Sequence, residues 1–252
     1  MSGVKIFISV ILIAMVLFVP AANAQPEVPV PRFTIGLDAA ETPQEVIDTF
    51  EILGILTILA LAPSILIMMT SFTRIIIVLS FVRNALGIQQ LPPNQVLIGL
   101  ALFLTFFVMA PIGTQIYDNA VTPYLENRIE QQEALDQAIG PIREFMFRNT
   151  RESDMNLFLY LAEQERPETL HEIPTHALIP AFIISELKTG FQIGFLIFLP
   201  FIVVDMVVAS TLMSMGMMML PPVMISLPFK ILLFVLVDGW NLVIRNLVMG
   251  FN

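Results

Sequence analysis

The chain has 252 residues, of which 56% are apolar and 13% are charged, and its mean hydropathy is +0.83. Acidic residues outnumber basic residues 21 to 12, which gives a formal net charge of −9. These values exclude a disordered chain and a nucleic-acid binder that works through a basic surface, and they favour a membrane protein over a soluble domain. Because the sequence contains no cysteine, it has no disulfide framework and no thiolate metal site.

Residues 1–24 are typical of a secretory signal peptide. Lys5 precedes an uncharged apolar run over residues 6–19, and Ala-Asn-Ala at 22–24 matches the small-x-small cleavage pattern. We therefore expect cleavage after Ala24. The alternative is an uncleaved membrane helix, but a span needs roughly 20 apolar residues and this run is shorter.

Four further apolar segments follow, and their length predicts membrane-spanning helices. They lie near residues 52–82, 96–117, 189–215 and 223–250. Arg74 and Arg83 flank the short link at 83–95, so the positive-inside rule predicts that this link is cytoplasmic. The stretch at 118–180 carries twelve acidic and five basic residues, and we expect it on the opposite side.

The predicted spans are interrupted by prolines and charges. Pro63, Pro200 and Pro228 lie inside apolar runs, where proline removes a backbone hydrogen bond and kinks or breaks a helix. A charge at the centre of a lipid-facing helix costs about 2.5–3.5 kcal/mol. We therefore expect kinked helices packed around a conduit, with charges that are buried or contact another subunit; the alternative is that they sit at the wet border of the membrane. The candidates are Arg74, Glu186, Lys188, Asp205, Lys230 and Asp238.

Two of these positions also allow a different reading, and two glycines predict a close helix contact. Asp205 and Asp238 could form a carboxylate pair that relays protons, although ion pairs that hold helices together explain them equally well. Gly190 and Gly194 form a small-xxx-small pattern, which lets two helix backbones approach closely.

The acidic middle stretch has a helical pattern. Thr122 and Pro123 predict a helix start, and Gly140-Pro141 predicts its end. Further helical segments are expected at 142–147 and 153–164. Because this stretch has few large apolar residues, it is better suited to an interaction surface than to an independent enzyme domain.

The sequence offers little sign of catalytic chemistry. It contains no phosphate-binding loop, and no nucleophile, base and oxyanion set stands out. His171 and His176 have the wrong spacing for a zinc helix, and Pro174 interrupts the segment between them. We predict that the chain is not an enzyme and has no catalytic, metal-binding or cofactor-binding residues.

Six of the fifteen methionines lie within residues 212–224, including the consecutive Met217, Met218 and Met219. Consecutive residues cannot share one face of a helix. Gly216 before them and Pro221-Pro222 after them predict a loop at a helix end. Methionine is unbranched and adaptable, so several copies around an axis would make a deformable apolar seal; the alternative is ordinary gap filling in a core.

Several motifs in this order resemble the FliP family of flagellar biosynthetic proteins, which belongs to the type III secretion export gate. The motifs lie at residues 69–75, 83–87, 89–95, 180–182, 185–195, 215–222, 225–230 and 237–240. The resemblance is close over 50–117 and 178–245 and loose in the acidic middle. The cleavable signal resembles the flagellar branch more than the virulence injectisome branch.

The resemblance implies an all-α membrane protein whose helical hairpins, with proline-interrupted helices, assemble into a cone-like oligomer. It implies a multi-pass protein of the bacterial inner membrane in the flagellar basal body. It also implies a pentameric homo-oligomer that associates with the sister gate proteins FliQ and FliR and with further export apparatus proteins, and that exports unfolded flagellar proteins. In this family a methionine gasket closes the conduit, which makes Met217, Met218 and Met219 its candidates.

The expected organisation has five parts: a signal peptide at 1–24, an extracytoplasmic segment at 25–50, a first hydrophobic hairpin at 51–117, an acidic helical region at 118–180, and a second hairpin with the methionine loop at 181–252. The alternatives for function are an injectisome gate subunit and, in a different class, a secondary transporter of a small solute that uses Asp205 and Asp238. A transporter of that kind has related halves, and no internal repeat stands out between 52–117 and 181–252.

Overall fold

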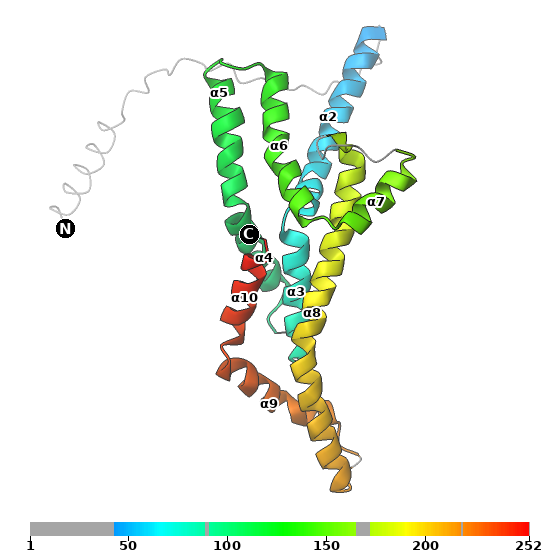
Figure 1. The fold of residues 1–252 in the computed structure, drawn as a ribbon, viewed down its shortest axis with the longest axis vertical. Helices are drawn as coiled ribbons and strands as arrows, with labels where there is room; N and C mark the ends of the chain where they lie inside the picture. Colours follow the sequence, from blue (N-terminus) through cyan, green and yellow to red (C-terminus); the bar gives the residue numbers. More distant parts are fainter. Residues whose placement is uncertain (1–42, 89–90, 165–171, 218, 252) are drawn as a thin grey trace, which may run out of the picture. The chain divides into compact units, whose positions relative to one another are not determined.

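The computed structural model describes residues 43–88, 91–164, 172–217 and 219–251. Within these residues the secondary structure is helical and no strand occurs (Figure 1). The chain divides into two units, Met1–Glu51 and Ile52–Asn252, and every tertiary contact discussed below lies in the second. Ala24 and the expected signal peptide lie outside the described residues.

The first predicted span at 52–82 is not one helix. α2 covers Pro43–Met68 and α3 covers Phe72–Ala85. Between them, the Thr70 hydroxyl donates to the Ile67 carbonyl at 3.0 Å and accepts the Phe72 N–H at 3.4 Å. Such short-range side-chain hydrogen bonds compete with the helix ladder, which explains the interruption.

α3 has one apolar stripe that is fully buried. Its members recur at helical spacing, and each has 0% exposure: Ile75, Val78, Leu79 and Val82. This period places all four on one helix face. α3 ends before Gly87, which has φ 75°, a left-handed conformation that favours glycine.

Two described helices are long and apolar enough to cross a bilayer. α4 covers Asn94–Ile116 and continues through the π-helix η1, Tyr117–Val121, into α5, Thr122–Leu125. α8 covers Thr175–Ser214, runs through Pro180 and Pro200, and includes the expected domain boundary at 180–181. The second and third predicted spans thus correspond to parts of longer helices.

The last predicted span, 223–250, is bent. α9 covers Pro222–Leu236 and α10 covers Gly239–Met249, and their axes differ in direction by 61° (Figure 1). Taken together, the two helices are apolar enough for a third crossing, so the described residues offer up to three spans where the sequence predicts four.

Two of the helix boundaries predicted for the acidic middle stretch, the start at Thr122 and the end at Gly140-Pro141, are wrong. Thr122 continues the preceding helix through η1, and the chain turns at Asn127, which has φ 55°; asparagine adopts this conformation at low cost. α6 then covers Gln131–Asn149 and passes through Gly140-Pro141 without ending. α7 follows at Glu152–Leu161, close to the helical segment predicted at 153–164.

α8 contributes to two buried cores. The first core joins α3, α4, α8, α9 and α10, and the second joins α6, α7 and the first turns of α8. Phe251, directly after Gly250, packs against both. The long helix is therefore the common support of the fold.

Large apolar side chains are also exposed on α4 and α8. On α4, Phe103, Phe106 and Phe107 are 70–76% exposed, and α8 exposes Phe195 and Leu196 in the same way. Exposed apolar area on this scale marks a surface for lipid or for another protein.

Candidate functional site

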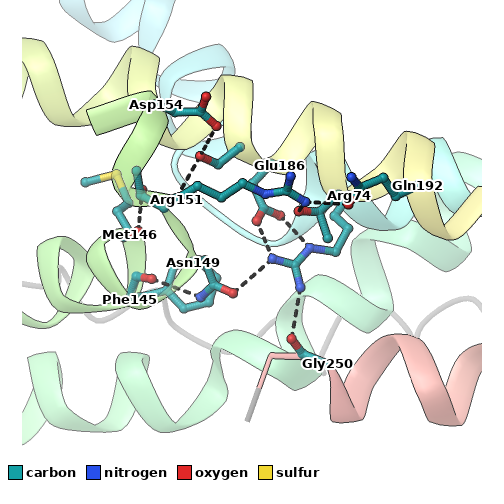
Figure 2. Close-up of polar contacts among 12 residues, drawn as sticks. Arg74, Phe145, Met146, Asn149, Arg151, Asp154, Glu186, Gln192 and Gly250 are labelled. Atoms are coloured by element: carbon teal, nitrogen blue, oxygen red, sulfur yellow. Dashed lines mark hydrogen bonds and ion pairs between the residues drawn. The ribbon is translucent and has the colours of Figure 1, made fainter. Parts of the chain in front are cut away.

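A buried ion pair joins α3 to α8. Arg74 is 5% exposed and Glu186 is 0% exposed. Arg74 Nε donates to Glu186 Oε2 at 3.0 Å, and Arg74 Nη2 donates to Glu186 Oε1 (Figure 2). A two-pronged guanidinium–carboxylate pair fixes the mutual orientation of both side chains, so it sets how α3 lies on α8.

The same guanidinium also contacts two other parts of the fold. Arg74 Nη1 donates to the Gly250 carbonyl at 2.9 Å, and Nη2 donates to Asn149 Oδ1 at 2.9 Å (Figure 2). The Phe251 ring lies 3.9 Å from the guanidinium carbon, in cation–π geometry. Arg74 thus connects α3, the end of α6, α8 and the segment that follows α10.

A second buried carboxylate fastens α7 to α8. Asp154 is 2% exposed, accepts the Ser185 hydroxyl at 2.8 Å and pairs with Lys188. Burial raises the pKa of Asp154, but hydrogen bonds from Lys188 and Ser185 and the charges of Lys188 and Arg151 outweigh it and hold this pKa below its usual value. The carboxylate is therefore stabilised in its charged form.

Arg151 extends this contact along α8. Its backbone N–H donates to Ser185 Oγ at 3.0 Å, and its guanidinium Nη2 donates to Thr189 Oγ1 at 3.1 Å and Gln192 Oε1 at 2.5 Å. Backbone and side chain of one residue thus contact α8 over about two turns, which holds the start of α7 at a fixed height on that helix.

A third pair joins α8 to α9. Lys230 is 3% exposed, and its Nζ lies 2.6 Å from Asp205 Oδ2. The Ser226 hydroxyl donates to Asp205 Oδ1 at 2.5 Å. Both oxygens of Asp205 therefore accept hydrogen bonds from α9, which favours a role in fastening α9 to α8.

The charged residues that the sequence analysis selects differ in how deeply they are buried. Arg74, Glu186 and Lys230 are buried, whereas the side chain of Lys188 is 49% exposed. The sequence names no partner for any of them, and each has one within this chain. Asp238 is exposed, between α9 and α10, and the contacts of Asp205 do not include it.

Three polar partners were not anticipated from the sequence. Asn149, Ser185 and Asp154 complete the network, yet each is an ordinary polar residue in a helical pattern. The only local sign is the start of α7, where acidic residues are favoured by the helix dipole. That sign predicts an acidic side chain facing solvent and not a buried one.

Gly190 and Gly194 lie where α8 meets α3. A Cβ atom built at Gly190 would lie 3.1 Å from Ile77 Cγ2, and one at Gly194 would lie 2.9 Å from Phe81 Cβ and closer still to the ring. Real Cβ atoms essentially never come so close to a neighbour as at Gly194. Both positions therefore leave room for side chains of α3.

The methionine segment is a loop between α8 and α9. Gly216 has φ 78°; its N–H bonds the Met213 carbonyl, and the Met217 N–H bonds the Leu212 carbonyl. This is the hydrogen-bond pattern of a glycine-terminated helix. Met219 is 99% exposed and Met217 is partly exposed, while Met218 lies outside the described residues.

Chemically, this arrangement fastens helices together. Among the residues that the structure describes, no three His, Asp or Glu side chains converge as metal ligands would. The buried acids Glu186 and Asp154 are each occupied by a basic partner. These contacts hold α3, α7 and α9 in fixed positions against α8.

Comparison with known proteins decides the family. The model of the FliP family matches residues 55–247, about three quarters of the chain. The chain belongs to the FliP family.

Similar FliP proteins come from several bacteria. The flagellar biosynthetic protein FliP of Bacillus subtilis (strain 168) is 58% identical over 217 residues, which cover 86% of this chain and 98% of that protein. The protein of the same name in Pectobacterium carotovorum subsp. carotovorum is 55% identical over 199 residues, 79% of this chain and 77% of the relative. That of Caulobacter vibrioides is 50% identical over 240 residues, 95% and 88% respectively.

The FliP match includes the three ion pairs, both helix-contact glycines and the methionine loop. It ends before Gly250 and Phe251, which contact Arg74. The ion pairs that join α3, α7 and α9 to α8 therefore lie in the shared part of the chain, and the contact of Arg74 with the segment after α10 lies just beyond it.

Proposed function

We propose that this chain is a core subunit of the flagellar type III protein export gate, part of the closed conduit through which unfolded flagellar proteins are secreted during flagellum assembly. The observation that carries this proposal is the FliP match over residues 55–247, together with relatives whose shared name is flagellar biosynthetic protein. The apolar helices agree with a membrane-embedded component.

The surface of the chain supports assembly into a larger complex. Exposed phenylalanines on α4 and exposed apolar residues on α8 can contact lipid or other subunits. We infer a homo-oligomer, pentameric and cone-like, that contains FliQ and FliR, contacts further export apparatus proteins and requires no nucleic acid. The half-exposed Lys188 is the charge of the network best suited to an additional contact with a neighbouring subunit.

The methionine loop is the part of the chain that we assign to closure of the conduit. Met219 is almost fully exposed. Gly216 and Pro221, on either side, separate the loop from both helices. Flexible thioether side chains can close an irregular hole and repack when a polypeptide passes. We propose that Met217, Met218 and Met219 of several copies form this gasket.

The alternatives have less support. A proton-coupled transporter would bring Asp205 and Asp238 to one site, but Asp205 bonds Lys230 and Ser226 while Asp238 is exposed at the bend. An injectisome gate subunit would have injectisome proteins among its similar relatives, and the relatives named above are flagellar.

The test is the native mass and composition of the complex extracted from its own membranes in mild detergent. We expect a particle many times 28.2 kDa that contains several copies of this chain and two small hydrophobic partner proteins. A stable monomer or plain dimer with no partner would overturn the proposal.

A further inference from the structure

The bend between α9 and α10 is built into the backbone. α9 ends at Leu236, and Asp238 has φ 49°, a left-handed conformation that stops a helix. Gly239 then packs on the Phe234 ring, where a Cβ atom would collide with the ring carbons, and Trp240 meets the same ring edge-on at 5.4 Å between centroids. Two residues therefore turn the chain by 61°.

The two arms of this bend are held in different ways. α9 is fastened to α8 near its middle, because Lys230 and Ser226 both bond Asp205. α10 has its polar attachment at its far end, where the Gly250 carbonyl accepts a hydrogen bond from Arg74. Phe251 adds the cation–π contact with Arg74 and a stacked contact with Phe145, 6.1 Å between centroids.

The space under the bend is incompletely filled. An apolar hollow of about 610 Å³ lies between α8 and the bent pair, with Ile193 and Ile197 on one side and Val243 and Leu247 on the other. Val243 and Leu247 are buried in the first core, whereas Leu242 and Asn246, which also line this hollow, are exposed. α10 is therefore held by two buried side chains along its length and by the contacts at its end.

We infer that Arg74 is a latch that holds α10 folded back, that Asp238 and Gly239 are its hinge, and that α10 can swing out while α9 stays attached to α8. In the open state, residues 222–249 form one continuous helix. At 1.5 Å per residue these 28 residues extend about 42 Å, enough to cross a hydrocarbon layer of about 30 Å. The inference goes beyond the proposed export function and does not depend on it.

The latch and the hinge act on one equilibrium, between a state in which residues 222–249 are bent and a state in which they form a straight helix. In the bent state, Arg74 binds the segment after α10 while the same guanidinium binds Glu186 on α8 and Asn149 at the end of α6. Closing the latch therefore joins α10 to α6 and α8, two of the three helices of the second core. We expect the straight arm to be the form that first enters the bilayer, and the bent arm to follow once α6 and α8 are in place.

The chain is well suited to a direct test because it has no native cysteine. Cysteines introduced at Met249 on α10 and at Phe195 on α8, both exposed, carry nitroxide labels in the full-length chain, diluted with unlabelled chain in its own membranes. The distance between the labels is measured by pulsed electron paramagnetic resonance. Because α10 is about 17 Å long, opening through 61° moves its end by roughly 17 Å.

Two variants open the latch by different routes. F251A removes the cation–π and stacking contacts while leaving the ion pair intact, and R74Q/E186Q removes the guanidinium without leaving a charge unpaired. The control is R83Q, which removes another arginine of α3, whose hydrogen-bond partners are Pro92 and Asn94 and not residues of α10.

We expect one distance population in the parent and in R83Q, and a second population, 10–17 Å away by the same helix-length estimate, in F251A and R74Q/E186Q. An unchanged distribution in F251A overturns the latch, even if R74Q/E186Q fails to accumulate. An equal shift in R83Q overturns it as well, because the movement would then reflect general loosening and not release at Arg74.

Discussion

Arg74 and Glu186 are 112 positions apart in the chain, and their side chains meet as a two-pronged ion pair where α3 crosses α8. Neither charge is more than 5% exposed. In this setting the pair tolerates joint replacement better than the loss of one partner, because a single loss leaves an uncompensated buried charge.

Glu186→Gln should therefore destabilise the chain strongly, by about 3–5 kcal/mol, and should lower the amount of assembled protein. Replacing both residues, Arg74→Met with Glu186→Leu, should recover part of that loss. The measurement is the midpoint of thermal unfolding of the purified complex in detergent. A single variant that melts with the parent would contradict the central place of this pair.

Gly194→Ala should loosen the α3–α8 contact, because the new Cβ atom collides with Phe81; overpacking of this kind costs about 1–3 kcal/mol. In a Phe81→Ala background the penalty of Gly194→Ala should largely vanish, as a double-mutant cycle would report. Gly99→Ala is the matched control, since nothing lies within 4 Å of a Cβ atom there. Equal losses at both glycines would point to helix backbone effects instead.

The lowered pKa of Asp154 predicts that the folded chain loses stability at low pH. Its pKa is held below 3.8 in the folded chain, so the unfolded chain binds the proton more readily. The stabilisation is present above that value and is lost as the pH falls through the folded-state pKa. Asp154→Asn should flatten this part of a plot of unfolding midpoint against pH, while Asp136→Asn, at an exposed position of α6, should leave it unchanged.

Asp205→Asn should impair assembly before it impairs proton coupling. The change removes the charged partner of Lys230, which is buried, and a hydrogen bond to a charged group contributes about 1.5–3 kcal/mol. Asp238→Asn is the control, because asparagine accepts the same left-handed backbone. Intact complexes that have lost proton-driven export in Asp205→Asn would favour a relay.

Replacing Met217, Met218 and Met219 by alanine should make resting membranes leak small ions, because the shorter side chains leave the proposed seal open. Conductance of membranes that contain the assembled complex measures this directly. Met206→Ala, at an exposed methionine within α8, should conduct like the parent. Unchanged conductance with normal secretion in the triple variant would remove the gasket assignment.

Local signals predicted local features well. The glycine and proline around the methionines predicted a loop, and the structure has one between α8 and α9. The period of apolar residues predicted helices throughout. These features depend on residues a few positions apart, where capping and periodicity act.

Features that depend on distant residues were not predictable in this way. Gly140-Pro141 was expected to end a helix, but Phe145 and Met146 are buried beyond it, and their packing continues α6 through the proline. The partners of Arg74 and Lys188 lie on other helices. A sequence pattern shows that a buried charge needs a partner and does not show which residue supplies it.

Because Arg74 and Glu186 lie far apart in the chain, Arg74 is synthesised well before its partner. A ribosome adds about 5–20 residues per second, so Arg74 exists for roughly 6–22 s before Glu186 is made, given their separation of 112 residues. Asp154 waits in the same way for Ser185 and Lys188. Until α8 has been synthesised, Arg74 and Asp154 lack the charged partners that this helix supplies. The side chain of Arg74, in the first third of the chain, can therefore be buried as an ion pair only after the last third has begun to be made.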